Sequence, residues 1–348
     1  MHPRTKPILT TLLTALLALA GGNAWAVEVS DQLELHGYGD IGHARSNVDA
    51  TGQQLGANET MHNLSLVAVW QASERTKLWA QLFRSSDLGQ VRVDWAFVDH
   101  QAPTGQTLRA GRVRLPFGLH NESRDVQALR PSASLPYLYE EDLALVDESF
   151  DGASVEQRFA LGAGAATVEV FAANRLTAGG TQRARGVVMG ARAIIETPVE
   201  GLSFRASAFA GRLTLNGADA RRAKRGWAAS ARYKHEAVDL QAEVARGFLY
   251  GRSVSTWYAQ AAHEVSDHWQ AFARLERIAT DTTQRGDDAF REQRWAVGAA
   301  YAVNQHFGLR LEQQFHRGYA IPVLLEMVEA GAGRPRWTST VLSANYQF

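Results

Sequence analysis

The chain has 348 residues, and its 36 basic and 36 acidic side chains balance at neutral pH. This balance argues against a nucleic-acid partner, and the absence of cysteine excludes disulfides and Cys-ligated metal or redox sites. Four lysines stand against 32 arginines. Most of the positive charge is therefore carried by planar guanidinium groups, which suit contacts with anions and carboxylates.

The first 26 residues have the pattern of a secretory signal peptide. Two basic residues precede an apolar run over 8–20, and Ala24 and Ala26 form an A-x-A cleavage site. The apolar run is short for a membrane anchor, which makes that alternative weaker. We therefore predict cleavage after Ala26 and one domain over residues 27–348.

Beyond this segment, apolar and polar residues alternate with period two, as in strands that present two different faces. In one example, Val238, Leu240 and Ala242 alternate with Asp239 and Gln241. Sixteen such runs lie near residues 33–42, 63–71, 76–84, 90–100, 107–113, 152–159, 165–173, 186–196, 202–212, 226–235, 238–247, 254–264, 268–277, 292–302, 306–315 and 337–348.

Seven short turns between these runs alternate with eight longer, polar connections, and both chain ends fall on the short-turn side. An even number of strands with unequal connections at the two rims is typical of outer-membrane barrels. We predict an all-β fold, a closed antiparallel transmembrane β-barrel of about 16 strands. A soluble β-sandwich would explain the alternation, but not the strand number and the unequal rims together.

Aromatic residues recur at the ends of the apolar faces. Trp95, Phe97, Trp227, Tyr233 and Trp269 are examples, and interfacial aromatic belts lie at such positions on membrane barrels. The opposite faces carry whole charged groups, so we expect them to line a lumen. The lumenal arginines expected on the wall are Arg92, Arg109, Arg192, Arg205, Arg232, Arg274 and Arg310.

The connection over 114–151 is the longest, and three prolines interrupt any helix or central strand in it. Its aromatic and aliphatic content argues for a packed loop and against disorder. Arginines crowd its beginning and carboxylates its end. In the stretch 111–152, which contains this connection, the expected constriction residues are Arg112, Arg114, Arg124 and Arg130, opposed by Glu140, Glu141, Asp142, Asp147 and Glu148.

The last strand places Leu342, Ala344, Tyr346 and Phe348 on one face, and the sequence ends at Phe348. This strand resembles the C-terminal strand of Gram-negative outer-membrane proteins, in which the terminal Phe is part of the assembly signal. Together with the sixteen strands and the long loop after the fifth, it makes the chain from residue 27 resemble the porin family. The segment 111–119 is also similar to that of porin-like proteins of proteobacteria.

This resemblance implies a loop that folds into the lumen and narrows the pore, although an external cap is the alternative reading of the same loop. It implies an outer-membrane location, recognition of Tyr346 and Phe348 by the barrel-assembly machinery, and a homotrimer as one assembly. Outer-membrane lipids and lipopolysaccharide are the expected surroundings. The basic run over 221–225 is a candidate for contact with lipopolysaccharide phosphates.

The expected function is a water-filled channel for passive diffusion of small hydrophilic solutes, with a preference for anions if arginines dominate the constriction. The alternative is a barrel plugged by its loop that acts as a receptor, adhesin or structural protein. Silence of the folded protein in conductance measurements would favour this alternative.

Enzymatic and cofactor functions have weak support. Residues 37–42 match G-x-G-x-x-G, but no helical pattern follows them, as dinucleotide binding requires. The histidines lack metal-ligand spacing, and no Ser/His signature points to a hydrolase. The acidic runs 140–142 and 287–288 are more typical of solvated loops than of cation sites. We therefore expect no enzyme activity, no cofactor and no metal.

Overall fold

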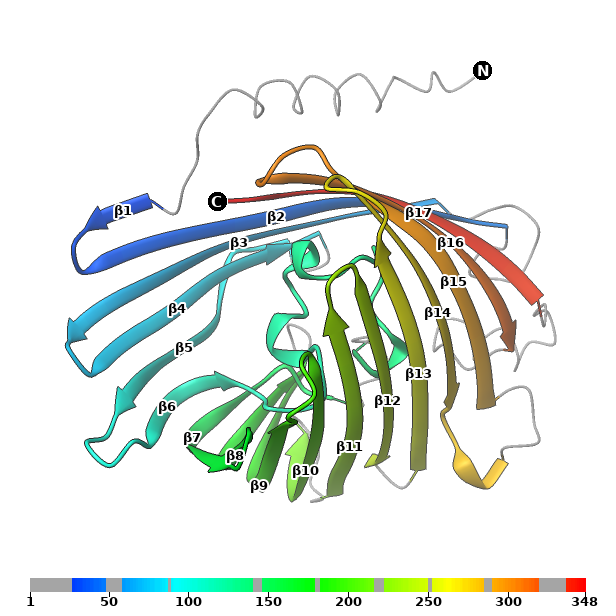
Figure 1. The fold of residues 1–348 in the computed structure, drawn as a ribbon. Helices are drawn as coiled ribbons and strands as arrows, with labels where there is room; N and C mark the ends of the chain where they lie inside the picture. The colour runs from blue at the N-terminus through cyan, green and yellow to red at the C-terminus, as the bar shows by residue number, and fades with distance from the viewer. Residues whose placement is uncertain are drawn as a thin grey trace.

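The computed structural model describes residues 27–47, 58–86, 89–139, 146–178, 182–215, 222–249, 252–284, 290–318 and 336–348. Their strands form one barrel (Figure 1). The strands are β1 (Val27–Ser30), β2 (Leu33–Ser46), β3 (Asn58–Ser73), β4 (Thr76–Ser85), β5 (Arg92–Gln101), β6 (Thr107–Arg114), β7 (Ser149–Leu161), β8 (Gly164–Ala178), β9 (Gln182–Glu196), β10 (Leu202–Leu215), β11 (Arg222–His235), β12 (Val238–Leu249), β13 (Arg252–Glu264), β14 (Trp269–Ala279), β15 (Arg291–Ala302), β16 (Phe307–Gly318) and β17 (Arg336–Gln347).

Helical structure is limited to single turns of 3₁₀-helix in the described residues. Three of them, η1 (Asn121–Ser123), η2 (Gln127–Leu129) and η3 (Tyr137–Tyr139), lie in the long connection after β6, and η5 (Thr282–Gln284) follows β14. No helix in the described part of the chain is long and apolar enough to span a membrane.

The sixteen long strands, β2 to β17, pair with their chain neighbours in antiparallel register, and β17 pairs with β2 to close the ring. At the closure, the Phe348 N–H donates to the Gly37 carbonyl (2.9 Å), and the Gly37 N–H donates to the Phe348 carbonyl (3.1 Å). The short strand β1 pairs with the same edge of β2 just beyond this point, with Val27 opposite Leu35. The predicted closed barrel of sixteen strands is confirmed.

The outer face of the barrel is apolar along the middle of the strands. Many large hydrophobic side chains point away from the lumen and remain exposed, which is the face expected to meet lipid. They include Leu66, Leu82, Val93, Val98, Leu108, Val170, Met189, Trp227, Val244, Trp257, Trp295, Val297, Leu311, Phe315 and Leu342.

A β-bulge in β5 reverses the orientation predicted for two aromatic residues. Leu82 of β4 pairs with Val93, whereas its neighbour Gln81 pairs with Trp95, so Asp94 is the extra residue. Val93 faces outward, 49% exposed, but beyond the bulge Phe97 packs against the buried apolar cluster of the lumen. The prediction that Trp95 and Phe97 belong to an outer aromatic belt is therefore wrong, because the bulge shifts the alternation by one residue.

Candidate pore constriction

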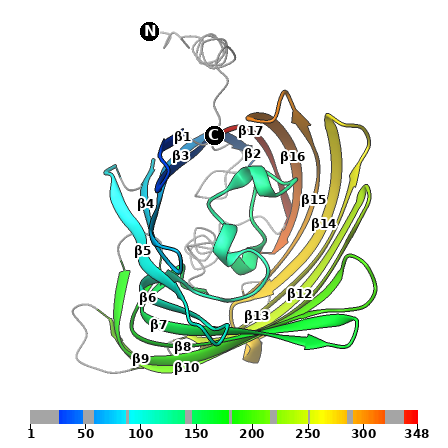
Figure 2. The same cartoon turned by 60° about the vertical axis from the view of Figure 1, so that its left-hand side comes forward.

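The connection between β6 and β7 lies inside the barrel. Figure 2 shows its helical turns within the ring of strands. Its described residues, 115–139 and 146–148, make side-chain contacts with strands on opposite sides of the lumen, including β4, β9, β12 and β16. The connection thus crosses the lumen, and we call these residues the lumenal loop.

Apolar packing fixes the lumenal loop on the side of β7 to β14. Leu115, Phe117 and Leu138 of the loop are almost completely buried against inward side chains of the wall. The rings of Phe117 and Phe209 meet edge to face, with centroids 5.4 Å apart. Besides Val113 of β6, the wall residues of this cluster are Phe150, Phe171, Ala173, Leu176, Val188, Phe209, Leu213, Ala228, Ala245, Val254, Tyr258 and Ile278.

Three wall glutamates accept hydrogen bonds from the loop backbone. Glu312 of β16 accepts the N–H groups of Ala133 (2.9 Å) and Ser134 (3.1 Å). Glu276 of β14 accepts the Tyr137 N–H (2.7 Å). On β12, Glu243 accepts the N–H of Leu119 at 3.1 Å. These bonds satisfy loop amides that would otherwise be buried without partners, which is costly.

Tyrosine hydroxyls strengthen two of these contacts. The Tyr139 hydroxyl donates to Glu243 (2.7 Å) and accepts the Leu119 N–H (2.7 Å). Burial, and then the adjacent Glu243 carboxylate, raises the pKa of Tyr139 well above its usual value. The hydroxyl therefore stays protonated and remains a donor at any pH at which the protein functions.

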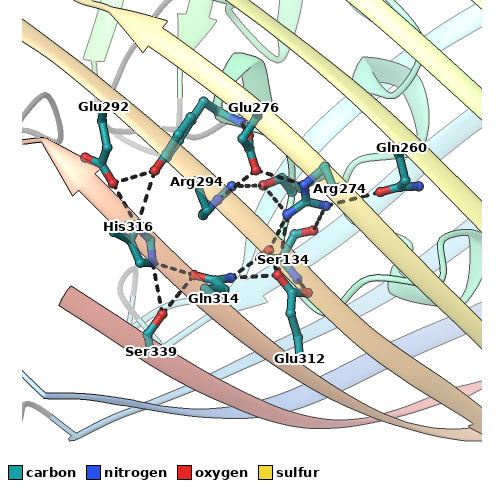
Figure 3. Close-up of polar contacts among 12 residues, drawn as sticks. Ser134, Gln260, Arg274, Glu276, Glu292, Arg294, Glu312, Gln314, His316 and Ser339 are labelled. Atoms are coloured by element: carbon teal, nitrogen blue, oxygen red, sulfur yellow. Dashed lines mark hydrogen bonds and ion pairs between the residues drawn. The ribbon is translucent and has the colours of Figure 1, made fainter. Parts of the chain in front are cut away.

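Two arginines neutralise the glutamates around the turn η3 (Figure 3). Arg274 donates through Nε to Glu276 (2.8 Å) and lies 3.4 Å from Glu312 through Nη2. Arg294 donates to Glu276 (2.7 Å) and to the Leu135 carbonyl (2.7 Å), and its guanidinium lies 4.1 Å from the centre of the Tyr137 ring. This network is buried, and its hydrogen bonds join β14, β15 and β16 to the loop.

Further ion pairs link the loop to β6, β9 and β11. Arg192 contacts Glu122 of η1 and the wall residue Glu169, which is 2.8 Å away. Arg114 pairs with Asp94 (2.8 Å) and with Asp125 of the loop. Near the C-terminal end of the loop, Asp147 pairs with Lys224 of β11.

Two wall arginines have no carboxylate within ion-pair distance among the described residues. Arg205 of β10 donates to the Leu119 carbonyl (3.4 Å), and its Nε has no hydrogen-bond partner in the part of the chain that the structure describes. Arg310 of β16 donates to the Arg130 carbonyl (3.0 Å) and to the Asn345 side chain. A cavity of about 360 Å³ at the short-turn end of the lumen is lined by Arg310, Arg130 and Asn345 and, at the turn after β13, by Glu264 and Asp267.

No protein-family model matches the chain, and no curated protein does. Solved structures are similar to it. The outer membrane channel DcaP of Acinetobacter baumannii has 10% sequence identity and a TM-score of 0.60, over 93% of this chain and 99% of that one. The anion-selective porin from Comamonas acidovorans has 12% identity and a TM-score of 0.64, over 91% and 99%. OprB of Pseudomonas putida has 12% sequence identity and a TM-score of 0.64, over 91% of this chain and 94% of that one. The chain has the porin fold.

Within this porin fold, most of the predicted constriction arginines lie in the lumen but are paired with carboxylates. Arg92 lies 3.5 Å from Glu148, and Arg109 lies 3.2 Å from Glu169. The predicted arginines with a carboxylate within ion-pair distance in the lumen are Arg92, Arg109, Arg114, Arg124, Arg192, Arg232 and Arg274. These charges hold the loop and the wall of the barrel together, whereas Arg205 and Arg310 lack a carboxylate partner among the described residues.

Arg112 does not lie in the lumen. It alternates with the inward residues Arg109 and Val113, so its side chain is on the outer face, where it pairs with Asp151 (2.8 Å). The expectation that Arg112 lines the constriction is wrong because it is one residue out of phase with Arg109 along the strand. Glu140, Glu141 and Asp142 lie outside the described residues, as do Ala24 and Ala26.

The glutamates Glu243, Glu276 and Glu312 and the arginine Arg294 were missed by reasoning from sequence. All four occupy the inward phase of their strands, so the alternation that selected the wall arginines could have found them. Among the described residues, His, Asp and Glu side chains nowhere gather in threes as metal ligands.

Proposed function

We propose that this chain is an outer-membrane channel through which small hydrophilic solutes diffuse passively. The protein is exported by its signal peptide and inserted by the barrel-assembly machinery through the strand that ends in Tyr346 and Phe348. Its proposed surroundings are outer-membrane lipids and lipopolysaccharide, and its proposed assembly is a homotrimer. The proposal includes no enzymatic step and no cofactor.

The observation that carries the proposal is the charged lumen of a sixteen-strand barrel crossed by its own loop. Barrels of this size are wide enough to leave an aqueous path, and the charges at the narrowest part set conductance and selectivity. The cavity of about 360 Å³ beside Arg130 and Arg310 supports such a path on the short-turn side of the loop.

Anion preference follows from the distribution of partners. The guanidinium groups paired with carboxylates contribute little net field, whereas Arg205 and Arg310 contact only carbonyl or amide oxygens in the described residues. A solute anion beside them is attracted without displacing a bound carboxylate. The similarity to an anion-selective porin is consistent with this inference.

The test is the conductance of the refolded protein in a planar bilayer under a KCl gradient. Stable current steps with a reversal potential of the sign that anion selectivity gives are expected. Arg205→Glu and Arg310→Glu should each move the reversal potential toward cation selectivity, and the turn variant Arg75→Glu should leave it in place. Unchanged potentials in both lumenal variants would contradict the assignment of these two arginines.

One observation favours the plugged barrel as a second candidate. The lumenal loop is held by an apolar cluster as well as by carboxylates, so it is fixed firmly on one side of the lumen. A receptor, adhesin or structural barrel would show the same heat-modifiable folding but no current steps. Absence of current from demonstrably folded protein would give this candidate the lead.

A further inference from the structure

The outer face of the barrel carries a belt of arginines next to the longer connections. Each lies within three residues of the strand end at that rim and, by the pairing register, points away from the lumen. We call these twelve residues the arginine girdle. They are Arg45, Arg84, Arg112, Arg175, Arg185, Arg212, Arg225, Arg246, Arg277, Arg291, Arg317 and Arg336.

The girdle is confined to one rim. At the short-turn rim, the lysines and arginines within three residues of the described strand ends lie in the lumenal phase. They are Lys77, Arg109, Arg158, Arg205, Arg232, Lys234 and Arg310. On the girdle side, the carboxylate that faces outward from the described strands is Asp151, held between Arg112 (2.8 Å) and Arg175 (3.0 Å). On the described strands, outward-facing arginines therefore gather at the rim of the longer connections and not at the short-turn rim.

Three arginines of the girdle gather around one cavity on β14, β15 and β16. Arg277 lies opposite Gln293, and Gln293 lies opposite Arg317. Arg277, Arg291 and Arg317 line a cavity of about 180 Å³, which Gln293 and Glu292 also line. The side chains of Arg277 and Arg317 form no ion pair or hydrogen bond with any described residue, and Arg336 of β17 lies opposite Arg317.

An apolar surface begins directly beside this cavity. Phe315 and Leu311 follow Arg317 on the outer face of β16, and Trp295 lies beside them on β15. These side chains are about half exposed, at 48%, 54% and 52%. Guanidinium groups at the edge of an apolar belt match a molecule with an anionic head and hydrocarbon chains.

A phosphate group is the anion that this arrangement fits best. A phosphate monoester carries about 1.5 to 2 negative charges at neutral pH and offers three acceptor oxygens, so it can occupy several guanidinium forks at once. A phospholipid present in both leaflets would favour cations at both rims. Cations at one rim match a lipid that occupies one leaflet only.

We propose that Arg277, Arg291 and Arg317 bind a phosphate of lipopolysaccharide, whose acyl chains lie along Trp295, Leu311 and Phe315. This assignment rests on the proposed outer-membrane location. It places the longer connections on the cell exterior by an argument independent of their length.

The test is native mass spectrometry of the refolded barrel in detergent, titrated with diphosphoryl lipid A. Arg277→Gln/Arg317→Gln is expected to weaken lipid A binding at least tenfold. Arg277→Lys/Arg317→Lys keeps both charges but loses the planar forks, and an intermediate loss of about threefold is expected. The matched control Arg75→Gln/Lys234→Gln removes two positive charges from the short-turn rim and should bind lipid A like the parent protein.

Equal affinity of the parent and Arg277→Gln/Arg317→Gln would overturn the site, as would an equal loss in the control. Binding of phosphatidylglycerol as tight as that of lipid A would overturn the assignment to a lipid of one leaflet. Heat-modifiable migration verifies that each variant is folded. The measurement does not involve current, so a barrel that binds lipid A but does not conduct would refute the channel and leave this site standing.

Discussion

Arginines on the two faces of this barrel have opposite surroundings, even when they are close neighbours in the chain. On β14, Arg274 points inward, is 1% exposed and lies 2.8 Å from Glu276. Three residues later, Arg277 points outward, is exposed and has no carboxylate partner among the described residues. The period of two along a strand therefore decides whether an arginine is a structural part of the lumen or a charge available to another molecule.

Removing the charge of Glu276 should have the largest effect. Glu276→Gln leaves Arg274 and Arg294 buried without their shared counter-ion and weakens the bond to the Tyr137 N–H. Loss of one partner from a buried ion pair costs about 3–5 kcal/mol. We expect this loss in the urea unfolding of the barrel in lipid vesicles, together with noisier or larger current steps as η3 loosens.

The matched control is Glu196→Gln, which breaks the exposed pair with Arg158 at the short-turn rim. Exposed pairs contribute little, so its unfolding midpoint should stay close to that of the parent protein. In addition, Glu276→Gln/Arg294→Met should recover part of the lost stability by removing one of the stranded charges. A midpoint shift in Glu276→Gln no larger than in the control would contradict the role of this network.

His120 of the lumenal loop is a partly buried group, and it should make the free energy of unfolding depend on pH. The expected effect is smaller than that of Glu276→Gln. The His120 side chain contacts Gln241 on the wall (2.8 Å), and burial, with the positive charge of Arg130, lowers its pKa to about 3. Between pH 6.5 and 3 the unfolded chain binds a proton here that the folded barrel does not. The free energy of unfolding should therefore fall as the pH is lowered through this window.

At pH 5 this histidine should cost about 2 kcal/mol relative to pH 7, because each pKa unit corresponds to about 1.4 kcal/mol. Urea unfolding at both pH values measures the effect, and His120→Gln, which retains an amide next to Gln241, should remove that part of the pH dependence. Identical pH dependence in parent and variant would show that the proton is accommodated in the folded state.

The barrel could be predicted from sequence because its information is local. Residues such as Leu240 and Gln241 alternate in one strand, and alternation, strand length and connection length suffice to count sixteen strands. The closure of β17 on β2 follows from the even number of strands and the common rim of both chain ends.

The candidate site was predicted less well because it depends on partners far apart in sequence. The pairing of Glu312 with Ser134, for example, joins residues of β16 and the loop. Inward phenylalanines such as Phe171 and Phe209 interrupt the expected polar face, since the loop brings its own apolar residues to meet them. The bulge at Asp94 leaves no trace in residue type.

Substitution of a single outward arginine should have the smallest effect on the stability of the isolated barrel. Substitution of an inward arginine should have a larger one. Arg317→Gln removes an exposed side chain that has no partner among the described residues, so the free energy of unfolding in detergent should change by less than about 0.5 kcal/mol. Arg294→Gln on the adjacent strand should lower the free energy of unfolding several times more.

Lipid A should raise the unfolding midpoint of the parent protein, because a ligand that binds only the folded state stabilises it. The rise should be smaller in Arg317→Gln and fully retained in Glu196→Gln. An equal rise in all three proteins would mean that lipid A stabilises the barrel without binding at Arg317. The outward arginines would then not be a binding site for this lipid.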